Sequence, residues 1–171
     1  MERIPLLTER EGLSERQLAI FDWVVESRGK MIRPYEVLLH APGLAKPAAE
    51  LGHQIRYEGV LSDHDRELAI ITAAKAHDCA FEWDSHVGLA RDAGVSDTAI
   101  AALESGGDDF TDAEEVIVGF VQDLCAESDV SDARFSAVAQ QLGGHGPVVE
   151  LAGLVGYYTF LGFVMKVAGA C

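Results

Sequence analysis

Helix-start signals recur along the whole chain and constrain its fold more than any other feature of the sequence. Ser14 with Gln17 and Thr111 with Glu114 have the spacing of a capping box, in which two side chains satisfy the first backbone N–H groups of a helix. Apolar residues follow these signals at helical intervals, and no stretch alternates apolar and polar residues as a half-buried strand would. The sequence therefore predicts an all-α fold, a helical bundle of six to eight helices with short links.

The expected helix ends follow from glycines and from one acidic residue. Gly29 and Gly94 suit the left-handed position just past a helix end, and Asp78 suits a break between two helices. In the third helix, the residues expected to face inward are Leu44, Ala48, Leu51, Gly52 and Ile55. The helices are expected over residues 15–28, 34–40, 44–57, 62–77, 79–93, 96–103, from 111 onward, 132–142 and 148–168, with a loop at 143–147.

Size and charge exclude several classes of protein. A chain of 171 residues fits a single domain spanning 1–171, which is the expectation, or at most two small domains. Its net charge of -15 argues against nucleic acid and against anionic lipid as partners, because both need a basic surface. Charged residues stand near the N-terminus where a signal peptide needs an apolar core, and the three cysteines show no paired spacing. We therefore expect a cytoplasmic protein without a disulfide scaffold.

The most apolar run, residues 151–165, is bounded by Glu150 and Lys166. It is shorter than the roughly 20 residues that span a bilayer, so we expect a buried helix and no membrane partner. This helix is apolar on more than one side, which places it either at the centre of the bundle or in a subunit interface. Burying such a helix all round is easier with a second subunit, so a homo-oligomer such as a dimer is expected.

The segment 67–86, ELAIITAAKAHDCAFEWDSH, concentrates the residues that can carry chemistry. Cys79, Glu82 and His86 fall within about 60° of one another around a helix, because steps of three and seven residues return to nearly the same side. Trp83 and Ala90 border this stripe and are expected to line a substrate pocket. Glu67 lies on the preceding helix and reaches the stripe only if the two helices pack closely.

The order and spacing of these residues resemble the carboxymuconolactone decarboxylase family, which includes the alkyl hydroperoxidase D proteins. The resemblance rests on RELAI, a Cys twelve residues after its Glu, EWxxH, and the downstream GVSDTAIAAL, and it covers about residues 36–128. It implies an all-helical subunit of the alkyl hydroperoxidase D-like type that assembles into trimers or hexamers and needs no cofactor.

The two branches of the family imply different roles for the same positions. The hydroperoxidase branch has a Glu, a Cys-x-x-Cys pair and a His, which correspond here to Glu67, Cys79 and His86, but Glu82 stands where the second Cys belongs. A dithiol peroxidase needs that second thiol to close a disulfide. The decarboxylase branch does not require it, and there the resemblance gives His86 the main role.

The preferred hypothesis is a cofactor-independent lyase or isomerase that moves a proton on a small organic acid or lactone. His86 would move the proton, Glu67 and Glu82 would set its charge and orientation, and Cys79 would line the pocket. The alternatives are a thiol peroxidase that uses Cys79 alone and a non-catalytic ligand-binding oligomer. An acidic substrate would need a cation, for which the candidates are Arg56, Arg66 and a neighbouring subunit's Arg33.

Structural roles compete with each catalytic role. His86 suits a core imidazole bonded to a backbone carbonyl, and Cys79 suits a buried inert thiol, since two nearby carboxylates disfavour its thiolate. The structural alternative for Glu67 is a carboxylate that stabilises the start of its helix, and the alternative for Glu82 is an acid on the surface, in contact with solvent. Glu82 and His86 have the spacing of metal ligands, but no second such pair is evident on a facing helix, so no metal is expected.

Overall fold

The computed structural model describes residues 3–126 and 129–171 and divides the chain into two compact units. The first unit contains residues 1–58 and 163–171, and the second contains residues 59–162. Every regular element in the described residues is helical, so the all-α fold predicted from the sequence is confirmed. Whether the whole chain acts as a single domain stays a prediction.

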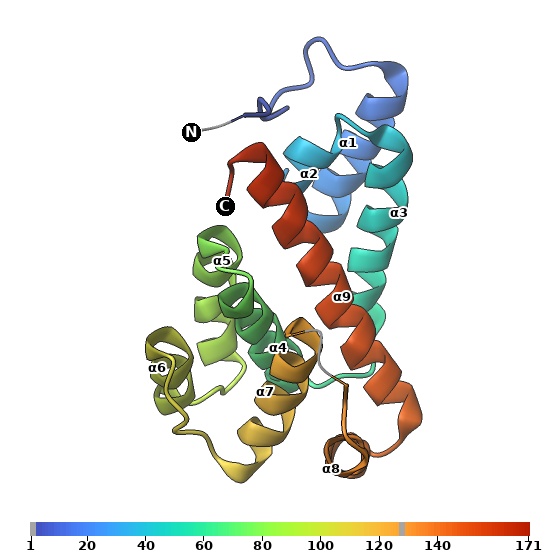
Figure 1. Cartoon of the computed structure of the whole chain (residues 1–171). Helices are drawn as coiled ribbons and strands as arrows, with labels where there is room; N and C mark the ends of the chain where they lie inside the picture. Colours follow the sequence, from blue (N-terminus) through green and yellow to red (C-terminus); the bar gives the residue numbers. More distant parts are fainter. Residues whose placement is uncertain (1–2, 127–128) are drawn as a thin grey trace. The chain divides into compact units, whose positions relative to one another are not determined.

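The first unit is built from three helices near the N-terminus (Figure 1), α1 (Glu15–Arg28), α2 (Arg33–Leu38) and α3 (Pro42–His53). The capping box at Ser14 begins α1, and Gly29 ends it with a φ of 77°, as the sequence predicted. Packing joins α3 to both α1 and α2. A short π-helix, η1 (Gln54–Glu58), continues α3 directly.

The inward face of α3 differs from the sequence prediction. Leu44 and Leu51 are 47% and 49% exposed, and the buried residues of the helix are Ala45, Ala48, Ala49 and Gly52. Small side chains let α3 approach its neighbours closely, so the face with the least bulk, and not the face with the leucines, points inward. The expected inward stripe is therefore wrong for the two leucines.

The second unit is organised around α4 (Asp63–Ala76), which packs against α5 (Ala80–Asp92), α6 (Asp97–Ser105) and α7 (Asp112–Cys125). Every residue of α4 from Glu67 to Ala74 is buried, as expected for a helix with neighbours on several sides. Figure 1 shows α4 and α5 in green, running side by side. The remaining helices are α8 (Asp132–Leu142), which packs against α7, and α9 (His145–Ala168), which begins in this unit.

The break between α4 and α5 lies where the sequence placed it. Asp78 has a φ of 48°, a left-handed conformation that Asp tolerates better than most residues. The backbone N–H of Cys79 donates to the carbonyl of Ala74 at 3.0 Å, which closes the turn. The chain therefore reverses tightly, and α5 folds back against α4.

The number of helices and the length of one loop differ from the sequence prediction. The described residues contain nine α-helices, which agrees with the nine ranges predicted individually and exceeds the predicted total of six to eight. The loop expected over residues 143–147 is shorter, because α9 begins at His145. Gly143 and Gly144 make the turn with φ values of 80° and 145°, and Pro147 is accepted because the first turn of a helix needs no N–H from it.

Helix α9 is apolar around much of its circumference. Its 24 residues, by length and composition alone, would suffice to cross a membrane, since the most apolar window has a mean hydropathy of 1.6. However, half of that window is buried within the protein. Core helices of water-soluble proteins have the same properties. Its exposed residues include Val149, Gly153, Gly156, Phe163 and Val167. Assembly through this face stays a prediction.

Candidate functional site

Glu67 is held in the most buried part of α4. Ser62 caps the helix by accepting a hydrogen bond from the backbone N–H of Asp65, and Glu67 follows in the second turn with only 2% of its surface exposed. An ionised carboxylate at such a depth needs charged or hydrogen-bonding partners, because its desolvation is costly. Two neighbours supply them, one on each oxygen.

The first partner is His86 in α5. Its Nδ1 lies 2.7 Å from Oε2 of Glu67, and both side chains are buried. A carboxylate only accepts hydrogen bonds, so an ionised Glu67 places the proton of the neutral imidazole on Nδ1. The Nε2 atom is then left as the basic nitrogen, with its orientation set by Glu67.

The second partner is Arg66, the residue before Glu67 in the same helix. Its Nε lies 3.4 Å from Oε1 of Glu67, and its terminal nitrogen donates to Asp63 at 2.8 Å. Both carboxylates therefore share one guanidinium, which offsets part of the negative charge beside His86. The candidate cation Arg66 is thus already engaged by protein carboxylates, and the other two candidates, Arg56 and Arg33, belong to the first unit.

Glu82 stands on the opposite side of the imidazole, one helical turn before His86. Its Oε2 lies 3.7 Å from Nε2 of His86, close enough for charge interaction and too long for a direct hydrogen bond. Glu82 is buried, so its expected alternative as a solvated surface acid is wrong. The structure therefore brings together Glu67, Glu82 and His86, which we call the acid–base cluster.

Tyr158 of α9 is a neighbour of this cluster that sequence reasoning missed. Its ring meets the imidazole of His86 edge to face, with centroids 5.3 Å apart and planes at 87°. Tyr157 in turn meets Tyr158 at 5.4 Å. No local signal marks Tyr158, because it sits among many apolar residues of a helix far along the chain from His86.

The other predicted site residues have different surroundings. Cys79 is the N-cap residue of α5, is buried, and is in the disulfide form, unlike the reduced state expected from the sequence. Trp83 is half-buried, and the ammonium of Lys75 lies over its ring at 5.3 Å. Ala90 is fully buried. Whether Trp83 and Ala90 line a substrate pocket stays a prediction.

The free cysteine is Cys125, at the end of α7. Burial raises the pKa of its thiol, although a hydrogen bond with Thr159 acts in the opposite direction. A raised pKa leaves little thiolate at neutral pH, so Cys125 has the character of a structural cysteine. Among the residues that the structure describes, no cluster of three His, Cys, Asp or Glu side chains is arranged to hold a metal ion.

Comparison with solved structures places this fold among known proteins. A cysteine-to-alanine variant of the debrominase Bmp8, in complex with 2,3,4-tribromopyrrole, superposes with a TM-score of 0.76, covering 100% of this chain and 93% of that one at 14% identity. The same debrominase without ligand gives a TM-score of 0.74, with 96% of this chain and 89% of that one covered, also at 14% identity. At this identity the similarity shows the fold alone.

A family model matches part of the sequence. No curated protein matches the chain. The model of the carboxymuconolactone decarboxylase family matches residues 42–118. These residues lie inside the segment of about 36–128 where the resemblance was expected. Residues 127 and 128 of that segment fall outside the described residues. The match contains α4, α5 and all three residues of the acid–base cluster. Residues 42–118 of this chain therefore match the carboxymuconolactone decarboxylase family.

Proposed function

We propose that the protein is a cofactor-independent enzyme of lyase or isomerase type that moves a proton on a small organic acid or lactone. The observation that carries the proposal is the 2.7 Å contact between Nδ1 of His86 and Oε2 of Glu67, which leaves Nε2 of the same imidazole facing a second carboxylate. The match to the family and fold similarity to an enzyme support catalysis in general.

In this proposal His86 takes a proton from an acidic carbon of the substrate through Nε2. Glu67 then stabilises the imidazolium through the hydrogen bond at Nδ1, as an orienting carboxylate does for a catalytic histidine. The imidazolium returns the proton to the same carbon, or to another carbon in an isomerisation. In a decarboxylation no C–H bond breaks: the bond to the carboxylate breaks with loss of carbon dioxide, and His86, protonated from solvent, gives its proton to the carbon left with the electron pair. Glu82 lies beside Nε2 and favours the charged imidazole while the proton is in transit.

The test follows exchange of carbon-bound hydrogen for deuterium, because it reports proton transfer even when the complete reaction is unknown. A panel of small organic acids and lactones is incubated with the protein in heavy water, and loss of the C–H signals is followed by NMR. We expect catalysed exchange on at least one member of the panel. His86→Gln should lower its rate by about a hundredfold to ten-thousandfold, because a positioned general base contributes that much.

The matched control is His145→Gln, since His145 is an exposed histidine at the start of α9. It should exchange at the same rate as the unsubstituted chain. The rate should also fall on acidification, because a protonated His86 cannot accept a proton from the substrate. Equal exchange in His86→Gln and the unsubstituted chain would reject the proposal.

A second candidate is thiol-dependent reduction of a peroxide or of a halogenated ring by Cys79. One support is the position of Cys79 at the start of α5, the helix that carries Glu82 and His86. The other is the fold shared with the debrominase Bmp8, whose complex with a ligand was obtained with a cysteine replaced by alanine. Its disulfide must first be reduced to a thiol. Peroxide consumption or bromide release that needs added thiol and disappears in Cys79→Ser would favour this candidate over proton transfer.

A further inference from the structure

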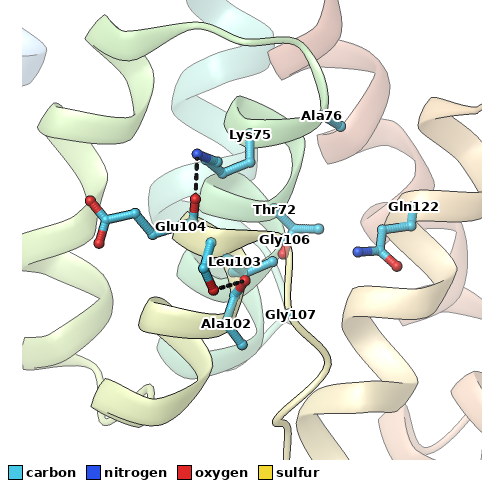
Figure 2. A pocket seen from close by; sticks show the side chains of 10 residues that line it. Thr72, Lys75, Ala76, Ala102, Leu103, Glu104, Gly106, Gly107 and Gln122 are labelled. Atoms are coloured by element: carbon cyan, nitrogen blue, oxygen red, sulfur yellow. Dashed lines mark hydrogen bonds between the residues drawn. The ribbon is translucent and has the colours of Figure 1, made fainter.

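A hollow of about 400 Å³ lies in the second unit between α4, α6 and α7. It is separate from the acid–base cluster, since none of Glu67, Glu82 and His86 lines it. Its volume lies in the range of small-molecule sites. The lining residues are Thr72, Lys75 and Ala76 from α4, Ala102 to Ser105 from α6, the following Gly106 and Gly107, and Gln122 from α7 (Figure 2).

Lys75 is the distinctive residue of this hollow. Four cations occur in residues 59–162, and three have carboxylate partners: Arg66 with Asp63, Arg91 with Asp97, and Arg134 with Asp123, at 2.8, 2.9 and 3.2 Å. Lys75 has no carboxylate within 4.0 Å among the described residues of this unit. In a chain with a net charge of -15, the one cation here that lacks a carboxylate partner faces a hollow.

The ammonium of Lys75 is positioned and retains donor capacity. It donates to the backbone carbonyl of Glu104 at 3.1 Å and lies over the ring of Trp83. Two of its three protons remain for a ligand. Figure 2 shows the carboxylate of Glu104 turned away from Thr72 and Gln122, so this neighbouring acid does not occupy the hollow.

The other polar groups of the hollow restrict the ligand further. The hydroxyls of Thr72 and Ser105 donate to carbonyls of their own helices at 2.7 Å, which leaves Lys75 and the amide of Gln122 as the side-chain donors. Figure 2 shows Lys75 and Gln122 on opposite sides, with Thr72 between them. The apolar part of the lining comes from Ala76, Ala102 and Leu103.

We propose that this hollow is a second ligand site, which binds a small monocarboxylate with an apolar body. The carboxylate pairs with Lys75, while the apolar body covers Ala102 and Leu103 and extends toward Gln122 on the opposite side. A single cation suits a singly charged acid better than a phosphate, for which proteins assemble several donors. Because Lys75 also contacts Trp83, which is next to Glu82, binding reaches α5, the helix that carries Glu82 and His86. The proposal stands apart from the acid–base function.

Trp83 supplies the readout. The chain has two tryptophans, so Trp23→Phe leaves Trp83 as the only tryptophan, whose emission is measured apart from that of the tyrosines. This variant is titrated with cyclohexanecarboxylate and, as a neutral ligand of the same shape, with cyclohexanecarboxamide. We expect a saturable change in emission with the acid, with a dissociation constant on the order of 1 mM, and weaker binding of the amide. Calorimetric titration of the unsubstituted chain checks that Trp23→Phe has not created the site.

Two variants separate the charge of Lys75 from the shape of the hollow. Lys75→Met should raise the dissociation constant about tenfold or more, because it removes the ion pair, whereas Lys75→Arg should retain binding. Ala76→Phe should block the hollow and leave the ammonium in place. The matched control is Lys46→Met, which removes an exposed lysine of the first unit and should change nothing. No saturable binding, equal binding of acid and amide, or unchanged binding in both Lys75→Met and Ala76→Phe would overturn the proposal.

Discussion

Two buried glutamates of the second unit have nearly the same exposure and opposite surroundings. Glu67 is 2% exposed and Glu114 is 3% exposed. Glu114 stands at the start of α7, where its two oxygens accept hydrogen bonds from the backbone N–H and the hydroxyl of both Thr111 and Ser96, at 2.8 to 3.1 Å. Because Thr111 caps α7 and Ser96 caps α6, this one carboxylate ties two helix starts together.

The partners of Glu114 are groups that carry no charge, whereas one partner of Glu67 is the imidazole of His86, which can gain and lose a proton. Burial acts to raise the pKa of Glu114, but the hydrogen bonds from Thr111 and Ser96 outweigh it and hold the pKa below its ordinary value. Glu114 therefore remains a fixed negative charge. Glu67 contacts an imidazole whose charge can change near neutral pH, so protonation there is coupled to a second group. Burial alone therefore does not identify a functional carboxylate, whereas the chemistry of its partners does.

The largest expected difference between the two glutamates is in activity. Glu67→Gln should lower the rate of hydrogen–deuterium exchange about a hundredfold or more, because an amide no longer stabilises the imidazolium of His86. Glu114→Gln should leave that rate within about twofold, since Glu114 does not contact the acid–base cluster. NMR measurement of exchange on the same substrate compares the two. Equal losses in both variants would remove the functional distinction drawn here.

For the free energy of unfolding, Glu114 should be the more important of the two glutamates. Glu114→Ala removes the acceptor for two helix caps and leaves their donors unsatisfied, so it should lower the free energy of unfolding by about 2 kcal/mol. Unfolding in urea, followed by circular dichroism, measures the loss. An exposed glutamate in the same unit, Glu104, provides the matched substitution to alanine, which should cost less than about 0.5 kcal/mol. A similar cost at both positions would contradict a structural role for Glu114.

The pH dependence of stability sharpens the same contrast. Because folding lowers the pKa of Glu114, its contribution is fully present above the ordinary pKa of a glutamate and is lost as the pH falls toward the lower folded-state value. The stability gap between the unsubstituted chain and Glu114→Gln should therefore narrow on acidification from about pH 6 to about pH 3. Urea unfolding at a series of pH values tests this. A gap that widens toward acid would mean that the sign of the shift is wrong.

The smallest expected effect concerns the ring contact between Tyr158 and His86. Edge-to-face aromatic pairs contribute about 0.5 to 1.5 kcal/mol beyond the area they bury. A double-mutant cycle of Tyr158→Leu and His86→Leu, measured by urea unfolding, isolates this coupling from the general cost of each substitution. We expect a favourable coupling within that range. A coupling of zero would leave Tyr158 as a packing residue only.

Local signals were enough to predict much of the fold and part of the site. The predicted caps at Ser14 and Thr111 each begin a helix, because a cap acts on backbone groups within one turn. Likewise, the spacing of Glu82 and His86 within one helix was readable, because helix geometry alone sets it. The inward face of α3 was not, since it depends on which neighbours pack closely and not on which residues are most apolar.

The sequence by itself determined that the chain is helical, where most helices begin, and that Glu82 and His86 share one face, because these properties arise from contacts within a few residues. Only the tertiary structure decided that Glu67 meets Nδ1 of His86, that Arg66 is engaged by Asp63 and Glu67, and that Tyr158 lies against the imidazole. Those contacts depend on how separate helices pack, and packing is set by the combined shapes of many side chains that no local pattern records.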